Sequence, residues 1–256
     1  MELAERFRDR VDDRLVGVAR ALVHGLEAIH PVRFEGLENL PAGPALLVGN
    51  HGLLGYETAL FFAHIFDATG RVPRGCADKW FFRVPLLRDV LIRIGGMYGA
   101  RGNAVDALTR RHLVVCYPGG AREVLKHHPD QRYQLRWETS LGFARVALRA
   151  GVPIVPFAAA GVDHTYEIGS RIVGSGQLLM GHDKYDLPRL KGLKGGPLPA
   201  AVPFWFRIGK PIAPVGNVEQ LHETAWRRTQ ALLDNLVAEW ERANSPAPAS
   251  NLACAS

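Results

Sequence analysis

Short apolar runs that alternate with amphipathic segments are the feature that most limits how this chain can fold. Runs that follow turn-forming residues predict strands at 32–36, 45–49, 112–117, 153–159 and 203–208. Apolar residues at helical spacing predict helices at 54–67, 83–93, 103–110, 138–150 and 217–243. This alternation predicts an α/β fold, with a single layered domain and a largely parallel central sheet flanked by helices.

An N-terminal amphipathic helix is predicted over residues 3–29. Its apolar residues recur every three or four positions, at Leu3, Phe7, Val11, Leu15, Val18, Leu22, Leu26 and Ile29. Such a helix can pack on the core or lie on a lipid surface, and the sequence leaves both interpretations open. We therefore divide the chain into this helix (1–30), a main domain (31–244) and a Pro/Ala/Ser-rich flexible tail (245–256).

Net charge and cysteine content narrow the class of protein. The 256 residues carry a formal net charge of +6, which suits an anionic membrane surface or an anionic substrate. Nucleic acid is not an expected partner, because zinc-finger spacing, aromatic RNA-binding motifs and long Lys/Arg runs are missing from the sequence. The three cysteines are odd in number and unpaired in spacing, which favours a reducing compartment over a disulfide framework.

Hydropathy sets the expected relation to membranes. The N-terminus is charged from Glu2 onward, unlike a secretory signal. No run reaches the roughly 18 apolar residues of a spanning helix. We expect a cytoplasmic location with peripheral association at the inner face of the membrane.

The stretch VGNHGLLGYE contains a candidate catalytic pair, His51 and Glu57. Six residues of helix turn through about 600°, so the two side chains would not share a face if both were helical. His51 must instead lie in the loop and fold back over the first helical turn, which Gly52 and Gly55 would permit. Glu57 could then orient the imidazole as a general base. The alternative is an ordinary helix start that begins near a histidine.

Three further segments carry possible chemistry. The stretch CYPGGAREVL, residues 116–125, places consecutive glycines before Arg122 and could hold a phosphate or an oxyanion, or be a plain turn. The segment 95–108 brings Arg101 next to a glycine, and 150–163 is an apolar strand bracketed by prolines. A serine-hydrolase elbow is missing.

No metal site is predicted. We interpret the adjacent pairs Asp163-His164, His127-His128 and His182-Asp183 as surface-loop residues rather than ligands.

Together, in this order, the four segments resemble the PlsC-like glycerolipid acyltransferase superfamily. Its first block is a His, four residues and an Asp; its third reads F-P-E-G-T-R-S. Here the second block matches 95–101, the third 117–123 and the fourth 152–156. The closing FRIGKPI, residues 206–212, also fits, so the resemblance spans about 32–215. Tyr56 replaces the Asp of the first block and Gly119 the Glu of the third.

Both departures resemble the branch of diacylglycerol acyltransferase and phytyl ester synthase-like proteins. The resemblance implies that His51 is the base and Glu57 its orienting acid. It implies substrate-binding roles for the positions that match the second and third blocks: Arg101, Tyr117, Pro118, Gly119, Gly120, Arg122 and Glu123.

The implied function is acyl transfer from an acyl thioester to a lipid alcohol. The donor would be acyl-coenzyme A or acyl carrier protein, with no other cofactor. The missing third-block Glu points to a neutral alcohol such as diacylglycerol, monoacylglycerol or a long-chain alcohol. A lysophospholipid acceptor, a thioesterase or esterase, and a non-catalytic lipid-binding module remain alternatives.

Overall fold

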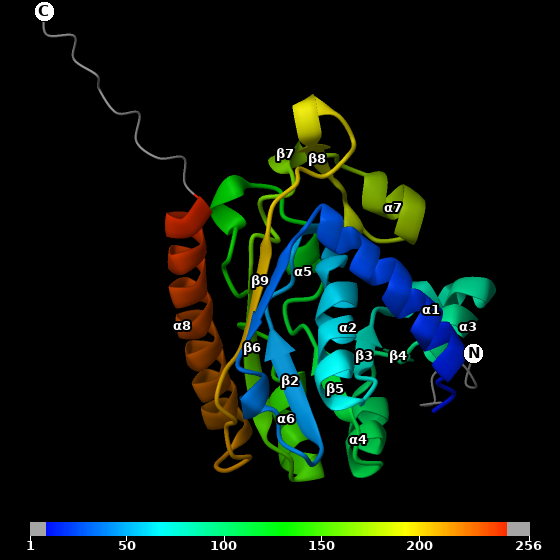
Figure 1. The fold of residues 1–256 in the computed structure, drawn as a ribbon, viewed down its shortest axis with the longest axis vertical. Coiled ribbons are helices and arrows are strands. Elements are labelled where there is room, and N and C mark those ends of the chain that lie inside the picture. The colour runs from blue at the N-terminus through cyan, green and yellow to red at the C-terminus, as the bar shows by residue number, and fades with distance from the viewer. Residues whose placement is uncertain (1–8, 245–256) are drawn as a thin grey trace, which may run out of the picture.

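The structure, a computed structural model, describes residues 9–244 (Figure 1). Residues 3–8 of the predicted N-terminal helix and the predicted tail at 245–256 lie outside the described residues. Within 9–244, no helix has both the length and the apolar composition needed to cross a bilayer.

A seven-stranded sheet forms the centre of the molecule, in the order β1-β9-β6-β2-β5-β3-β4. The bounds are β1 Val32–Glu35, β2 Ala45–Gly49, β3 Arg74–Ala77, β4 Gly96–Tyr98, β5 Leu113–Cys116, β6 Ile154–Ala160 and β9 Phe204–Ile208. Every neighbouring pair is parallel except β6 and β9. The predicted α/β fold with a largely parallel sheet is therefore confirmed.

The antiparallel pairing of β6 and β9 follows from the connection between these two strands. The chain leaves the C-terminal end of β6, forms a long connection over residues 161–203, and enters β9 at the same end of the sheet (Figure 1). A connection that returns at the same end makes its two strands antiparallel. The connection contains a small ladder of β7 (Glu167–Arg171) and β8 (Pro188–Lys191), with α7 (Ser175–Met180) between them. These elements were not predicted from the sequence.

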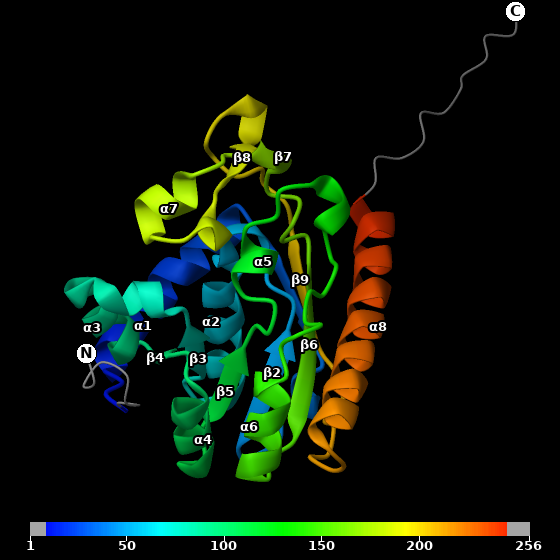
Figure 2. The ribbon, with the colours of Figure 1, turned by 180° about the vertical axis from the view of Figure 1, so that it is seen from behind.

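Helices cover both faces of the sheet. Helix α2 (Glu57–Thr69) lies on one face, with α1 (Asp13–His24) outside it (Figure 1). Helices α4 (Arg101–Thr109), α6 (Gly142–Ala150) and α8 (Val218–Asn244) lie on the other (Figure 2). Helix α3 (Pro85–Arg93) follows a 3-10 turn, η4 (Lys79–Arg83), and lies at the β4 edge.

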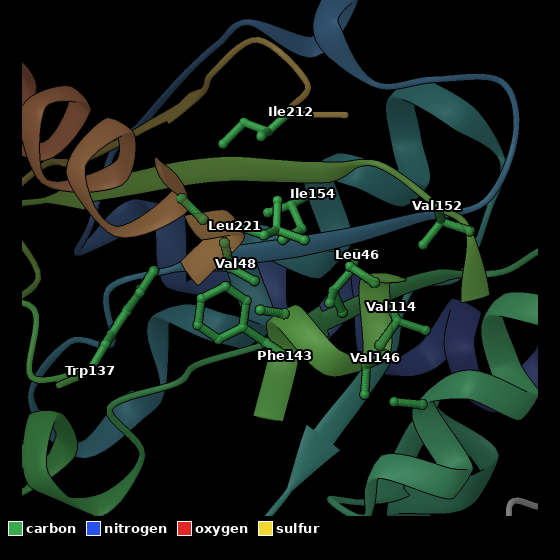
Figure 3. Packing of buried hydrophobic residues seen from close by; sticks show 14 of the residues in the cluster. Leu46, Val48, Val114, Trp137, Phe143, Val146, Val152, Ile154, Ile212 and Leu221 are labelled. Carbon is green, nitrogen blue, oxygen red and sulfur yellow. The ribbon is translucent and has the colours of Figure 1, made fainter. Parts of the chain in front are cut away.

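The two cores on either side of the sheet are separated by the alternation of strand residues. In β2, Ala45 and Leu47 pack with the α2 side, whereas Leu46 and Val48 pack with the α6 and α8 side. Figure 3 shows the second core, where Leu46 and Val48 lie near Phe143. Because both faces of β2 are buried, the strand reads as a continuous apolar run.

The N-terminal helix is shorter than predicted. Helix α1 begins at Asp13, because the Asp12 side chain accepts hydrogen bonds from the Arg14 and Leu15 amides and caps it there. It ends at His24, and a 3-10 turn, η1 (Gly25–Ala28), follows.

The packed face of α1 also differs from the predicted one. Val16 is buried, whereas Val18 and Leu22 of the predicted apolar stripe are 57% and 73% exposed. The helix therefore rests on α2 through neighbouring positions and leaves part of its apolar stripe open to solvent.

Two short strands, β3 and β4, were also not predicted. Their sequences, RGCA and GMY, are too short and too rich in glycine to show a strand pattern. They extend the sheet beyond β5 and place the Arg101 segment at its far edge.

Candidate active site

The candidate site lies where β2 and β5 end. These neighbouring strands are parallel, with Val48 paired to Cys116, so the residues that follow them leave the same edge of the sheet. His51 follows β2 and Tyr117 follows β5. Sites of α/β proteins form at this carboxyl edge.

His51 contacts Glu57 as the sequence analysis required. Its Nδ1 lies 2.7 Å from Glu57 Oε1, which also accepts a hydrogen bond of 2.9 Å from the Gly52 amide. The chain folds back through a 3-10 turn, η3 (Leu53–Gly55), before α2 begins at Glu57. Gly55 has φ +73, and a Cβ there would lie 2.6 Å from His51 Cε1, so glycine is needed for both backbone and space.

The Glu57 carboxylate is buried and charged. Its side chain is 2% exposed, against 16% for His51. Burial alone would raise the pKa of Glu57, but the charge and hydrogen bond of His51, with the Gly52 amide, lower it below its ordinary value. Within residues 9–244, Oε2 of Glu57 has no hydrogen-bond partner. This arrangement can hold the imidazole in one tautomer and stabilise it when it gains a proton.

Tyr117 covers the imidazole ring. The two rings stack with their centroids 3.9 Å apart and their planes 14° from parallel, and Thr58 Oγ1 donates to the Tyr117 hydroxyl at 2.9 Å. Burial raises the pKa of Tyr117, so the phenol stays neutral. Among the described residues, none is hydrogen-bonded to His51 Nε2. That nitrogen is therefore available to accept a proton.

Glu123 holds the backbone of His51 rather than its ring. It lies in the short helix α5 (Ala121–Val124), is 1% exposed, and accepts from the amides of His51 and Arg136 at 3.0 and 2.9 Å. Burial raises the pKa of Glu123 above its ordinary value. Both oxygens are engaged by the protein, so the geometry makes Glu123 a positioning residue for His51.

Gly119 makes room for that carboxylate. A Cβ at position 119 would lie 2.1 Å from Glu123 Oε1. Gly119 replaces the third-block Glu of the superfamily motif, and Glu123 stands four residues later. The two residues therefore depend on each other. The carboxylate of Glu123 fills the space that a side chain at position 119 would need.

A buried ion pair supports the same loop. Lys126 Nζ lies 3.0 Å from Asp163 Oδ1 and donates to the His51 carbonyl at 2.9 Å. Asp163 accepts from the Leu53 amide at 3.1 Å. Asp163 is fully buried, so its assignment to a surface loop was wrong. Sequence reasoning missed both residues, because Asp163 is 110 positions from Leu53 and no local pattern connects them.

The remaining predicted residues lie around Ser140, which sequence reasoning also missed. Its hydroxyl donates to the Pro118 carbonyl at 2.8 Å and accepts from Arg122 at 3.2 Å. Arg101 begins α4, after the edge strand β4, three strands from β2 and so about 14 Å away at the usual spacing. Its Cδ lies 3.9 Å from the Cβ position of Gly142 at the start of α6, two residues after Ser140.

The glycine turn offers fewer free amides than predicted. The Gly120 amide donates to the Tyr117 carbonyl at 3.0 Å, so it is not available to an oxyanion. In the described part of the chain, the Gly119 amide has no hydrogen-bond acceptor. Of the two glycine amides in this turn, only that of Gly119 is left as a possible donor to an oxyanion.

A basic pocket of about 330 Å³ adjoins α5. Its charged lining residues are Arg122, Arg136, Arg171, Lys184 and one acid, Asp183. Arg171 is also ion-paired with Asp186. Helix α5, which contributes Arg122 to the lining, packs against η3 of the loop that carries His51. Clustered guanidinium groups of this kind suit phosphate groups.

The neighbouring cysteine is not a second nucleophile. Burial raises the pKa of Cys116 well above its ordinary value, which leaves the thiol protonated.

Comparison with known proteins reveals relatives that make lipids. The chain is 32% identical over 213 residues to a mouse DGAT1/2-independent enzyme synthesizing storage lipids, covering 80% of this chain and 60% of that protein. It is 30% identical over 256 residues to chloroplastic phytyl ester synthase 2 of Arabidopsis thaliana, covering 85% of this chain and 34% of that protein. The chain thus spans about 60% or less of the length of these relatives.

A solved structure supports the fold. The 1-acyl-sn-glycerophosphate acyltransferase PlsC of Thermotoga maritima matches with a TM-score of 0.52 at 17% identity, over 86% of this chain and 78% of that one. The family model described as Acyltransferase matches residues 31–160, which include His51, Glu57 and the glycine turn. The resemblance predicted from the motifs is confirmed: the chain belongs to the acyltransferase family.

Proposed function

We propose that this protein is an O-acyltransferase that moves a fatty acyl group from a thioester to a lipid alcohol. The observation that carries the proposal is the His51–Glu57 pair, with Nδ1 and Oε1 2.7 Å apart and Nε2 free of protein partners among the described residues. An imidazole that is oriented by a buried carboxylate and has one free ring nitrogen is suited to general-base catalysis.

The step requires no covalent enzyme intermediate. His51 Nε2 takes the proton of the acceptor hydroxyl as its oxygen bonds to the thioester carbonyl carbon. The Glu57 carboxylate offsets the charge of the imidazolium, and the Gly119 amide, which has no acceptor among the described residues, would donate to the oxygen on which negative charge develops. The carbon–sulfur bond then breaks, the thiolate leaves, and the proton passes from the imidazolium to the sulfur.

The donor is proposed to be acyl-coenzyme A or an acyl carrier protein. Both carry a phosphate-bearing pantetheine arm, and the pocket beside α5, lined by three arginines, a lysine and Asp183, has a net basic lining suited to such groups. No further cofactor is needed, because attack on a thioester needs no redox group.

The acceptor is proposed to be a neutral alcohol such as diacylglycerol, monoacylglycerol or a long-chain alcohol. Support comes from the relatives that make storage lipids and phytyl esters, and from Gly119 at the position of the third-block Glu. The basic pocket favours one alternative, a lysophospholipid whose phosphate would occupy it.

We also propose that the protein works on a membrane surface, at the cytoplasmic inner face. Large apolar side chains are exposed on three elements, with Leu22 at 73%, Leu86 at 78% and Leu178 at 84%. Near α7 they stand among basic residues such as Arg171 and Lys184, a combination that favours anionic lipid surfaces.

The test is product analysis after incubation with labelled acyl-coenzyme A and separate acceptors, one of them a lysophospholipid. We expect a labelled neutral ester and free thiol in equal amounts. His51→Ala should reduce both by about 10⁴-fold with an unchanged circular dichroism spectrum.

Other products would assign another function. Thiol release without ester identifies a thioesterase, and a labelled phospholipid identifies the lysophospholipid acceptor. If wild type and His51→Ala are equally inactive with every donor and acceptor, the chain is a lipid-binding module.

A further inference from the structure

A second cluster of ionisable side chains lies at the seam between α1 and α2, apart from the His51 loop. His24 ends α1 and Glu27 lies in η1, three residues on. His64 and Asp67 lie on α2 with the same spacing. Side chains three apart share a helix face, so each segment directs a histidine and a carboxylate at the other.

Three atoms of this cluster have the spacing of metal ligands. His24 Nδ1, Glu27 Oε1 and His64 Nε2 all lie within 4.8 Å of one another. Glu27 Oε1 is 2.5 Å from His24 Nδ1 and 3.2 Å from His64 Nε2. Ligands of a tetrahedral zinc ion stand about 3.3 Å apart, given bonds of about 2.0–2.1 Å. Small side-chain rotations would reach that geometry.

The outer contacts also match those of a metal site. The second ring nitrogen of His24, Nε2, is 2.8 Å from Asp67 Oδ2, and Asp67 is in turn ion-paired with Arg20. A ligating histidine commonly donates its other N–H to a carboxylate, which fixes the tautomer and orients the ring. The ring of His64 is held by stacking on Phe34, with centroids 5.5 Å apart.

We propose that His24, Glu27 and His64 bind one zinc ion, with Asp67 orienting His24 and water completing the coordination. Imidazole and carboxylate ligands together suit zinc better than calcium or magnesium, which prefer oxygen ligands. The ligand side chains are 23–30% exposed, so the ion can enter from solvent.

The ion would fasten the N-terminal helix to the helix that carries Glu57. Helix α1 covers α2 with few buried side chains: in the described part, Val16 is its one buried residue. Two ligands from the α1–η1 segment and one from α2 would cross-link the elements. None of the residues in this cluster belongs to the proposed acyl-transfer machinery, and the inference does not rest on that function.

The test is zinc titration of the untagged, chelator-treated protein by calorimetry. We expect one ion per chain and a melting temperature that rises with zinc, because the ion binds the folded state. Asp67→Asn should bind about 10- to 100-fold more weakly. The double variant His24→Ala, His64→Ala should not bind. Calcium should not compete.

His128→Ala is the matched control. This histidine also pairs with a nearby carboxylate, Asp130, but both are largely exposed and outside the cluster, so zinc binding should be unchanged. If the double variant fails to fold, Glu27→Gln keeps the side-chain volume and should still weaken binding at least tenfold. Absence of saturable binding, or equal binding by wild type and Glu27→Gln, would show an ion-pair cluster only.

Discussion

Two buried carboxylates approach His51 from different segments, and they do different things. Glu57, at the start of α2, contacts the imidazole ring, whereas Glu123, in α5, binds the backbone amide of the same residue. Their side chains are almost equally buried, yet the pKa of Glu57 is lowered and that of Glu123 is raised. Burial opposes the charge in both, and only Glu57 faces a ring whose charge and hydrogen bond outweigh it.

Glu57 and Glu123 therefore have different roles, one in the proposed chemistry and the other in positioning the chain. A carboxylate that faces a titrating ring can respond when the ring gains a proton, which suits the orienting acid of a general base. A carboxylate bound to two amides fixes the path of the chain instead. The motif position of an acid therefore says less about its role than the group that it faces.

Removing the charge of Glu57 should have the largest effect of these changes on the rate of acyl transfer. Glu57→Gln should lower kcat on the order of 10²–10⁴-fold, with little change in donor KM, because it removes the charge that stabilises the imidazolium. Glu219→Gln is the matched control, since Glu219 is an exposed first-turn acid of α8. A loss confined to KM would show that Glu57 only shapes the donor site.

A side chain that crowds Glu123 should have a moderate effect on stability and on the rate of acyl transfer. Gly119→Ala places a Cβ 2.1 Å from Glu123 Oε1 and should cost about 1–3 kcal/mol in the free energy of unfolding. It should also lower the acyl-transfer rate by moving the carboxylate off the His51 amide. Gly102→Ala, where the space is open, is the control in urea unfolding. Equal stability of the two variants would contradict the packing argument.

The pH dependence of stability should give the smallest and most specific difference. The ordinary pKa of both carboxyls is 4.5. Because the pKa of Glu57 is lowered on folding, its stabilisation is present above that value and is lost as the pH falls through the folded pKa. Because the pKa of Glu123 is raised, its contribution is present below that value and is lost as the pH rises through the folded pKa.

Urea unfolding from about pH 3.5 to 7 measures this difference. The stability gap between wild type and Glu57→Gln should widen as the pH rises, and the gap for Glu123→Gln should narrow. If both gaps change in the same direction, the two carboxylates do not differ as the contacts imply.

Much of the candidate site could be predicted because its residues are close in sequence. The six-residue separation of His51 and Glu57, with glycines between them, already required a histidine in a fold-back loop. Lys126 and Asp163, which support this loop, and Ser140, which holds the Pro118 turn, could not be predicted. Their partners lie 22 to 110 positions away, and only the packing of α5 and the end of β6 brings them together.

The α/β class, most of the strands and helices, and the family could all be predicted from the amino-acid sequence, because they depend on local periodicity and on motifs within short segments. Tertiary structure decided the strand order, the reversal at β9 and the packed face of α1. It also decided which acid meets the ring of His51 and which meets its backbone. Those features depend on contacts between distant segments, and a side chain's charge and hydrogen bonds are set by the neighbours that such contacts supply.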